Sequence, residues 1–95
     1  MATWPNGEKI YLAAAGDAKV DGTGSQAILH TFTLNKAAAS AVVTLYDGQS
    51  TTGSKVATVD ASVAALGTLT YDIRCANGVY AVMTGGNADV TISVL

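Results

Sequence analysis

The sequence predicts an all-β domain: an antiparallel β-sandwich of two sheets, with a jelly-roll or Ig-like topology and about seven or eight strands. Three observations carry this prediction. Apolar residues alternate with polar ones at period two, glycine-rich turns recur about every 8–12 residues, and no segment reaches the length of a stable helix. Strands with one apolar face bury it by packing two sheets together.

The expected strands follow from the alternation. It is strictest in residues 67–75, where every second residue from Leu69 to Cys75 is apolar. Between residues 26 and 34 the set predicted to point inward is Ile28, His30, Phe32 and Leu34. The run 41–46 is β-prone almost without a break, so we expect it to be covered on both sides. The complete set of strands is 8–14, 17–21, 26–34, 41–46, 55–60, 67–75, 79–84 and 89–95.

Glycine marks the turns. Asn77-Gly78 separates two expected strands, and both residue types tolerate the positive φ angles of a type I′ turn. We therefore predict a two-residue hairpin that joins 69–76 to 79–84. The residues predicted to fill the core between the sheets are Phe32, Val43, Leu45, Leu69, Ile73, Val90 and Ile92.

The 95 residues suffice for one domain, which we place at 8–95. Residues 1–7 are expected to form an N-terminal arm, which carries the one Trp and the one Pro of the sequence, Trp4 and Pro5. The N-terminus lacks the basic and apolar segments of a signal peptide, and no apolar run approaches the roughly 20 residues that cross a bilayer. We therefore expect no signal peptide and no membrane partner.

The surface is expected to be poor in charge. Only 13% of the residues are charged and the formal net charge is −2. The basic residues form no run: they are Lys9, Lys19, Lys36, Lys55 and Arg74. Nucleic-acid binding needs clustered cations, so we expect no nucleic-acid partner. Weak repulsion, together with few Lys or Pro to protect open sheet edges, predicts a homo-oligomer.

No set of residues fits catalysis, a metal or a cofactor. His30 is the one histidine and Cys75 the one cysteine. A zinc site needs three or four ligands, and a nucleophilic cysteine needs a base and an electropositive setting. We therefore expect Cys75 to be buried and His30 to lie in the core or at a sheet edge. The chain is predicted to be no enzyme and to bind no cofactor.

Three residues are candidates for a protein interface. Asp72 and Arg74 lie two apart on the predicted solvent face of one strand, where they either form an exposed ion pair or contact another subunit. Trp4 stands apart from every expected strand. It either caps one end of the sandwich or lies on a neighbouring molecule, where a single Trp buries a large area.

Residues 42–60 resemble a pattern in small structural proteins of tailed bacteriophages. The pattern is a strand ending in Leu45-Tyr46-Asp47, a Ser/Thr-Gly loop, and a second strand ending at Asp60. Three later segments continue the likeness, which covers about residues 25–95: they are 67–72, 77–80 and 88–94.

The resemblance implies a virion component without an active site, assembled in the host cytoplasm. Its most concrete form is a capsid decoration or cement protein that binds the major capsid protein or other virion proteins. Decorations often occupy three-fold positions, so the resemblance also favours a trimer. The main alternative is a tail, neck or fibre component. A host-surface or carbohydrate-binding module is a further alternative, with candidate residues Tyr46, Tyr80, Trp4, Asp47, Asn77 and Asn87.

Overall fold

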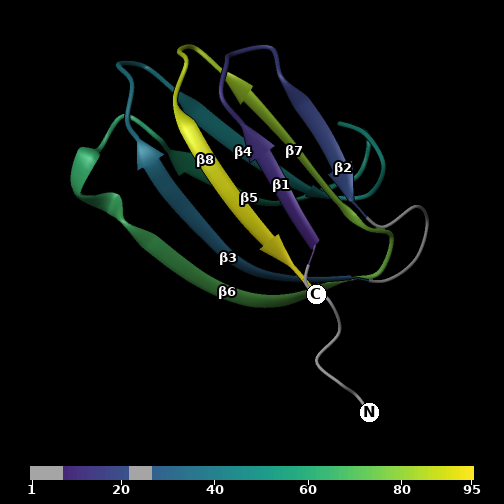
Figure 1. Ribbon diagram of the computed structural model, residues 1–95. Coiled ribbons are helices and arrows are strands. Elements are labelled where there is room, and N and C mark those ends of the chain that lie inside the picture. Colours follow the sequence, from purple (N-terminus) through teal and green to yellow (C-terminus); the bar gives the residue numbers. More distant parts are fainter. Residues whose placement is uncertain (1–7, 22–26) are drawn as a thin grey trace.

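A computed structural model describes residues 8–21 and 27–95 and shows two antiparallel sheets of four strands packed face to face (Figure 1). The strands are β1 (Glu8–Leu12), β2 (Ala18–Asp21), β3 (Ala27–Lys36), β4 (Val42–Asp47), β5 (Ser54–Asp60), β6 (Thr68–Cys75), β7 (Val79–Thr84) and β8 (Asp89–Val94). A three-residue 3-10 turn, η1 (Ala64–Leu66), precedes β6. Within the described ranges no helix is long and apolar enough to cross a bilayer.

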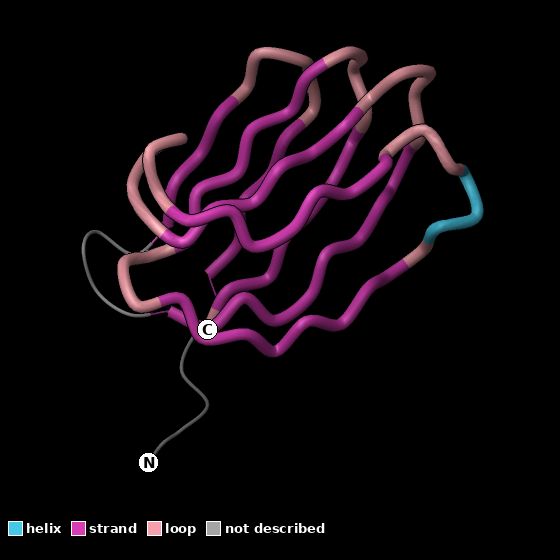
Figure 2. Tube along the Cα trace, turned by 180° about the vertical axis from the view of Figure 1, so that it is seen from behind, coloured by secondary structure: helices cyan, strands magenta, loops and turns pink. Residues whose placement is uncertain are grey.

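The sheet order identifies the topology. One sheet has the order β1-β8-β3-β6 and the other has the order β2-β7-β4-β5. Every successive pair of strands along the chain except β4 and β5 therefore lies in different sheets. Figure 2 shows the strands and the loops that connect them from behind. This is the eight-stranded jelly roll. The predicted sandwich is confirmed, and of its two predicted topologies the jelly roll is the one present.

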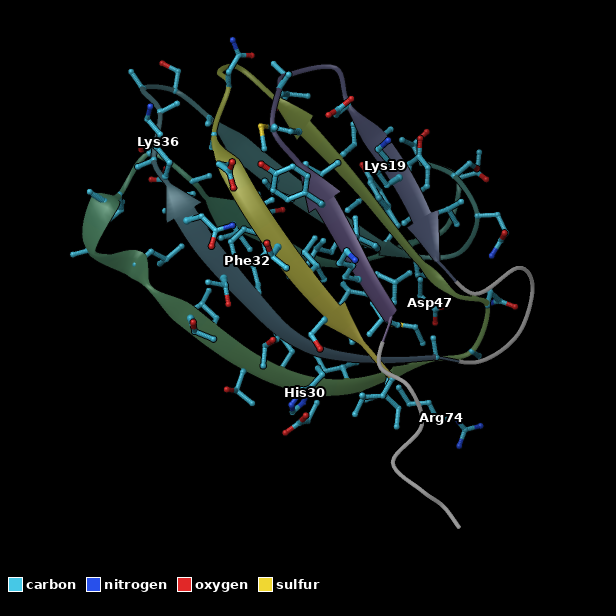
Figure 3. All side chains as sticks on the ribbon, in the orientation of Figure 1. Lys19, His30, Phe32, Lys36, Asp47 and Arg74 are labelled. Atoms are coloured by element: carbon cyan, nitrogen blue, oxygen red, sulfur yellow. The ribbon has the colours of Figure 1, made fainter. Side chains whose placement is uncertain are left out.

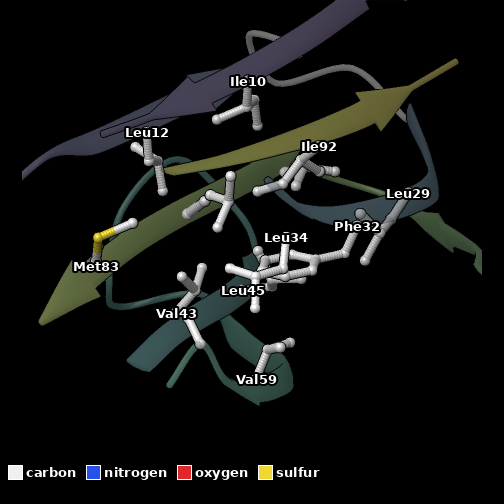
Figure 4. Packing of buried hydrophobic residues seen from close by; sticks show 14 of the residues in the cluster. Ile10, Leu12, Leu29, Phe32, Leu34, Val43, Leu45, Val59, Met83 and Ile92 are labelled. Carbon is white, nitrogen blue, oxygen red and sulfur yellow. The ribbon is translucent and has the colours of Figure 1, made fainter. Parts of the chain in front are cut away.

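The core lies between the two sheets and is wholly apolar among the described side chains (Figure 4). Phe32, Leu45 and Ile92 are fully buried there. Of the other residues predicted for the core, Val43 and Val90 are buried, and Leu69 is partly buried against the cluster. Each side chain of this size contributes about 1.5–3 kcal/mol when it is removed from water.

A β-bulge overturns two of the predicted side-chain positions. Tyr71 and Asp72 of β6 together oppose His30 of β3, because Leu29 pairs with Ile73 whereas Thr31 pairs with Thr70. Opposite β8, on the other side of β3, His30 is itself an extra residue, because Leu29 pairs with Val94 and Thr31 pairs with Ser93. The alternation of β3 therefore shifts at His30, so that Leu29 rather than Ile28 is buried. The prediction of Ile73 as a core residue was wrong. It shares a face with Leu29 but lies on an edge strand, where 38% of it stays exposed.

The predicted hairpin at Asn77-Gly78 was also wrong. Strands β6 and β7 belong to different sheets, so these two residues turn a corner between the layers. Gly78 does have a positive φ, 103°, which explains why a glycine stands there. The Asp47 carboxylate accepts hydrogen bonds from the backbone N–H groups of Ala76 and Asn77, at 3.2 and 2.8 Å, and so holds the corner against β4.

Candidate interaction surfaces

His30 does not point inward as predicted. Its side chain is 37% exposed and its Nδ1 contacts Asp72 Oδ1 across the bulge. Figure 3 shows the side chain directed away from the sandwich. The Asp72 backbone has a φ of 51°, a conformation that Asp tolerates better than most residues. The pair therefore joins β3 to β6 at the bulge, and both side chains are exposed to solvent.

Of the three predicted interface residues, two are described. Asp72 pairs with His30, and no described contact joins it to Arg74, so the first of the two alternatives, an Asp72–Arg74 ion pair, is not formed. Contact of these residues with another subunit stays a prediction. Arg74 is exposed opposite Ile28, beside a shallow hollow that Ala27 and Leu95 also line. Trp4 and the rest of the predicted arm lie outside the described residues, so their role stays a prediction.

Cys75 is buried in the core, as the sequence predicts. Burial raises the pKa of its thiol, and the negative charge of Asp47 adds to this effect. A thiol in that state is a poor nucleophile. Among residues 8–21 and 27–95, no group of three or more His, Cys, Asp or Glu is placed to hold a metal ion.

The outer face of the β1-β8-β3-β6 sheet is covered mainly by hydroxyl groups. Three of its strands each present two of them, and the register sets these side by side: Thr31, Thr33, Thr68, Thr70, Thr91 and Ser93. Thr33 and Thr68 are hydrogen-bonded at 3.0 Å. At one end Asn35 donates to Asp89 at 2.9 Å, and Tyr11 also donates to Asp89. The middle of this face is therefore polar, and its exposed apolar residues, Tyr11 and Ile28, lie on β1 and β3 with β8 between them.

The outer face of the other sheet is different. We call it the valine–tyrosine face, and its members are Ala18, Val20, Val42, Thr44, Tyr46, Tyr80 and Val82. Val20 is 43% exposed, and the others are half-buried or exposed. The rings of Tyr46 and Tyr80 lie side by side, with centroids 6.2 Å apart. The face thus combines two exposed apolar residues, Ala18 and Val20, with a partly buried apolar centre, which makes it a candidate interaction surface.

This face corrects the expectation for residues 41–46. The apolar run was expected to be covered on both sides, and the structure covers one. Val43 and Leu45 are buried in the core, whereas Val42, Thr44 and Tyr46 belong to the valine–tyrosine face. No described helix or strand lies over them. The strand therefore has the composition of a doubly covered strand, but one of its faces is open.

Charge on the valine–tyrosine face is confined to its β5 edge among the described side chains. Register places Lys55 beside Tyr46 and Asp60 beside Val42, at opposite ends of β5. Ser62 donates to the Asp60 carboxylate from its hydroxyl and from its backbone N–H, and these bonds lower the pKa of Asp60. The face thus carries one cation and one anion, separated by the length of a strand.

All four sheet edges are protected against strand addition. The edge strands β1 and β2 have only five and four residues. The edge strands β5 and β6 are each interrupted by a bulge. Lys19 of β2 is the register partner of the buried Ala81, so it lies on the inner side of the edge strand. A charged residue in this position also disfavours pairing with another strand. The sequence did not reveal this protection, because neither bulges nor strand order is visible in it.

Two of the residues predicted for sugar binding, Asp47 and Asn87, hold parts of the fold together through their side chains. Asp47 holds the corner at Ala76 and Asn77, and the Asn87 Oδ1 accepts from the Ala15 N–H at 2.8 Å. Tyr46 and Tyr80 remain as an aromatic pair. The structure therefore brings the two tyrosines together but does not place Asp47 or Asn87 as free groups beside them.

Neither a protein-family model nor a curated protein matches the chain. Among solved structures it is similar to a protein from the study "Bacillus endospore appendages form a novel family of disulfide-linked pili". The TM-score is 0.55 at 15% sequence identity, and the match covers 94% of this chain and 82% of that chain. At this identity the similarity shows a shared fold and no more.

Proposed function

We propose that the chain is a non-enzymatic structural protein that acts in many copies through protein–protein contacts. The valine–tyrosine face carries this proposal, since it is an open apolar sheet face in a domain whose edges are protected. The fold shared with a pilus-forming protein supports it, because such subunits work by self-assembly. The likeness to phage structural proteins supports the same class of function.

The finer proposal is a capsid decoration protein of a tailed bacteriophage that binds the major capsid protein. It rests on the pattern in residues 42–60, whose two strands the structure places side by side as β4 and β5. The jelly roll is used for many purposes, so the fold itself does not select a position in the virion. A tail, neck or fibre component follows from the same residues.

The structure argues against assembly of this chain through disulfide bonds. The chain has one cysteine, and Cys75 is completely buried. A bond from Cys75 to another subunit would require the sandwich to open. We therefore propose that copies of this chain associate through non-covalent contacts. The study from which the structural neighbour comes describes disulfide-linked pili, so the two proteins would differ in this respect.

Sedimentation velocity from about 10 µM to about 1 mM tests the proposed class of function. We expect the average sedimentation coefficient to rise with concentration, because small apolar contacts are weak individually and strong in arrays. Co-sedimentation with undecorated phage heads tests the finer assignment. A chain that stays monomeric and binds no particle would contradict the structural role.

A second candidate, a carbohydrate-binding module, is supported by the Tyr46–Tyr80 pair alone. Sugars stack on such rings, so titration with cellohexaose, followed through tyrosine fluorescence, distinguishes the two. Saturable binding at millimolar sugar or below, lost in Tyr46→Ala and Tyr80→Ala, would favour this candidate.

A further inference from the structure

We propose that the valine–tyrosine face binds the same face of a second copy, in a two-fold contact that sets Lys55 of each copy against Asp60 of the other. This inference rests on the proposed function and names the partner of the surface that supports it. It also replaces the three-fold association implied by the phage resemblance with a two-fold one at this face.

The register arranges the face in three rows across the sheet. The first row is Lys55, Tyr46, Tyr80 and Val20, the second is Thr58, Thr44, Val82 and Ala18, and the third is Asp60, Val42 and Thr84. The charges occupy the first and third rows on the same edge strand. The middle row is free of charge among the described side chains, and Val82 lies near its centre.

Two-fold packing of aligned sheets has two principal forms. With the axis along the strands, β5 faces β2 of the second copy, and Lys55 lies over the apolar Val20. With the axis across the strands, β5 faces its own copy in the opposite direction, and the first row meets the third. Lys55 then meets Asp60 at both ends of the contact, and only this form pairs every described charge of the face.

The rest of the face fits this second form. Tyr46 packs on Val42 of the second copy, and Val82 meets its own counterpart at the axis. Sheets that pack face to face lie about 10 Å apart, a gap that Lys and Asp side chains bridge together. Hydrogen bonds from Ser62 lower the pKa of Asp60, so it is ionised at neutral pH.

The size of the face predicts a weak contact. Four strands about 4.8 Å apart and about five residues long give roughly 300 Å² per copy. Interfaces of this size belong to the transient class. We therefore expect a dimer with a Kd in the high micromolar range or weaker, which becomes effective when many copies are held together.

A charge-reversal cycle tests the pairing. We expect Lys55→Asp and Asp60→Lys each to weaken the dimer about tenfold, because each places like charges together at both ends, and the double variant to recover most of the affinity. Sedimentation equilibrium gives the Kd, and circular dichroism checks the fold. Lys9→Asp is the matched control, since it makes the same charge change on the exposed side of the other sheet and should leave the Kd unchanged.

Asp60→Lys also removes the hydrogen bonds from Ser62, so its effect on the dimer has two causes. Lys55→Asp removes no such bond and therefore tests the charge pairing by itself. A wild-type chain that dimerises with no response to Lys55→Asp, or a double variant no tighter than the single ones, would overturn this contact and leave the structural role standing. Binding of cellohexaose at Tyr46 and Tyr80 without self-association would overturn the contact in favour of the sugar. A strict monomer that binds phage heads would overturn the contact but not the proposed function.

Discussion

Ile73 and Ile92 share the inner side of the same sheet but differ in how far neighbouring strands cover them. Ile92 lies on β8 between two strands and is completely buried, whereas Ile73 lies on an edge. We expect Ile92→Ala to lower the free energy of unfolding by about 2–5 kcal/mol and Ile73→Ala by about 1 kcal/mol. Urea denaturation measures both. Equal losses would show that the β6 edge is covered.

Asp89 predicts a pH effect on the hydroxyl-rich side of the domain. Hydrogen bonds from Tyr11 and then Asn35 lower the pKa of its carboxyl, and Lys36 adds to this. A carboxyl whose folded pKa lies below its unfolded value stabilises the fold above that unfolded value, near 4, and the stability is lost as the pH falls through the folded pKa. Tyr11→Phe should therefore raise the pKa of Asp89.

Carbon-detected NMR titration of the Asp89 carboxyl measures this shift. Tyr80→Phe is the matched control, because Tyr80 lies on the other sheet and should leave the pKa of Asp89 unchanged. An Asp89 pKa that does not move in Tyr11→Phe would mean that the bond is not kept in solution.

At the scale of elements, two glycines separate backbone strain from crowding. Gly67 and Gly85 both have positive φ, 68° and 84°. A β-carbon on Gly67 would meet nothing within 4 Å, whereas one on Gly85 would lie 2.1 Å from the Ser40 carbonyl oxygen. We expect Gly67→Ala to cost about 1 kcal/mol from strain alone and Gly85→Ala about 1–3 kcal/mol more. Thermal melts that show equal losses of stability in the two variants would contradict the close approach of Gly85 to Ser40.

The strand positions were predictable because alternation and turn chemistry are local. The ends of β7 match the prediction, and those of the other strands lie within two residues of it. The errors at Ile73, His30 and Asn77-Gly78 have other causes. A bulge shifts the alternation by one residue without any sign in composition. A glycine such as Gly78 indicates a positive φ at its own position. It does not indicate which strand the next strand pairs with, because that depends on the whole topology.

At the scale of the whole molecule, the two outer faces differ in chemistry, and this difference carries the functional proposal. The sequence predicted association from low charge and open edges. The edges are protected, so we transfer the prediction to the valine–tyrosine face. Trp4 was predicted from its isolation alone and stays a prediction. The face itself could not be predicted, because the run 41–46 looks the same whether its second side is covered by the same chain or by another.

The most direct test of the account compares one charge on each outer face. Val82→Glu places two carboxylates together at the proposed axis, whereas Thr31→Glu adds the same charge to the middle of the hydroxyl-rich side. Sedimentation equilibrium at about 1 mM should show that Val82→Glu abolishes the dimer and that Thr31→Glu leaves it unchanged. A dimer that survives Val82→Glu and is lost in Thr31→Glu would contradict the assignment of the valine–tyrosine face.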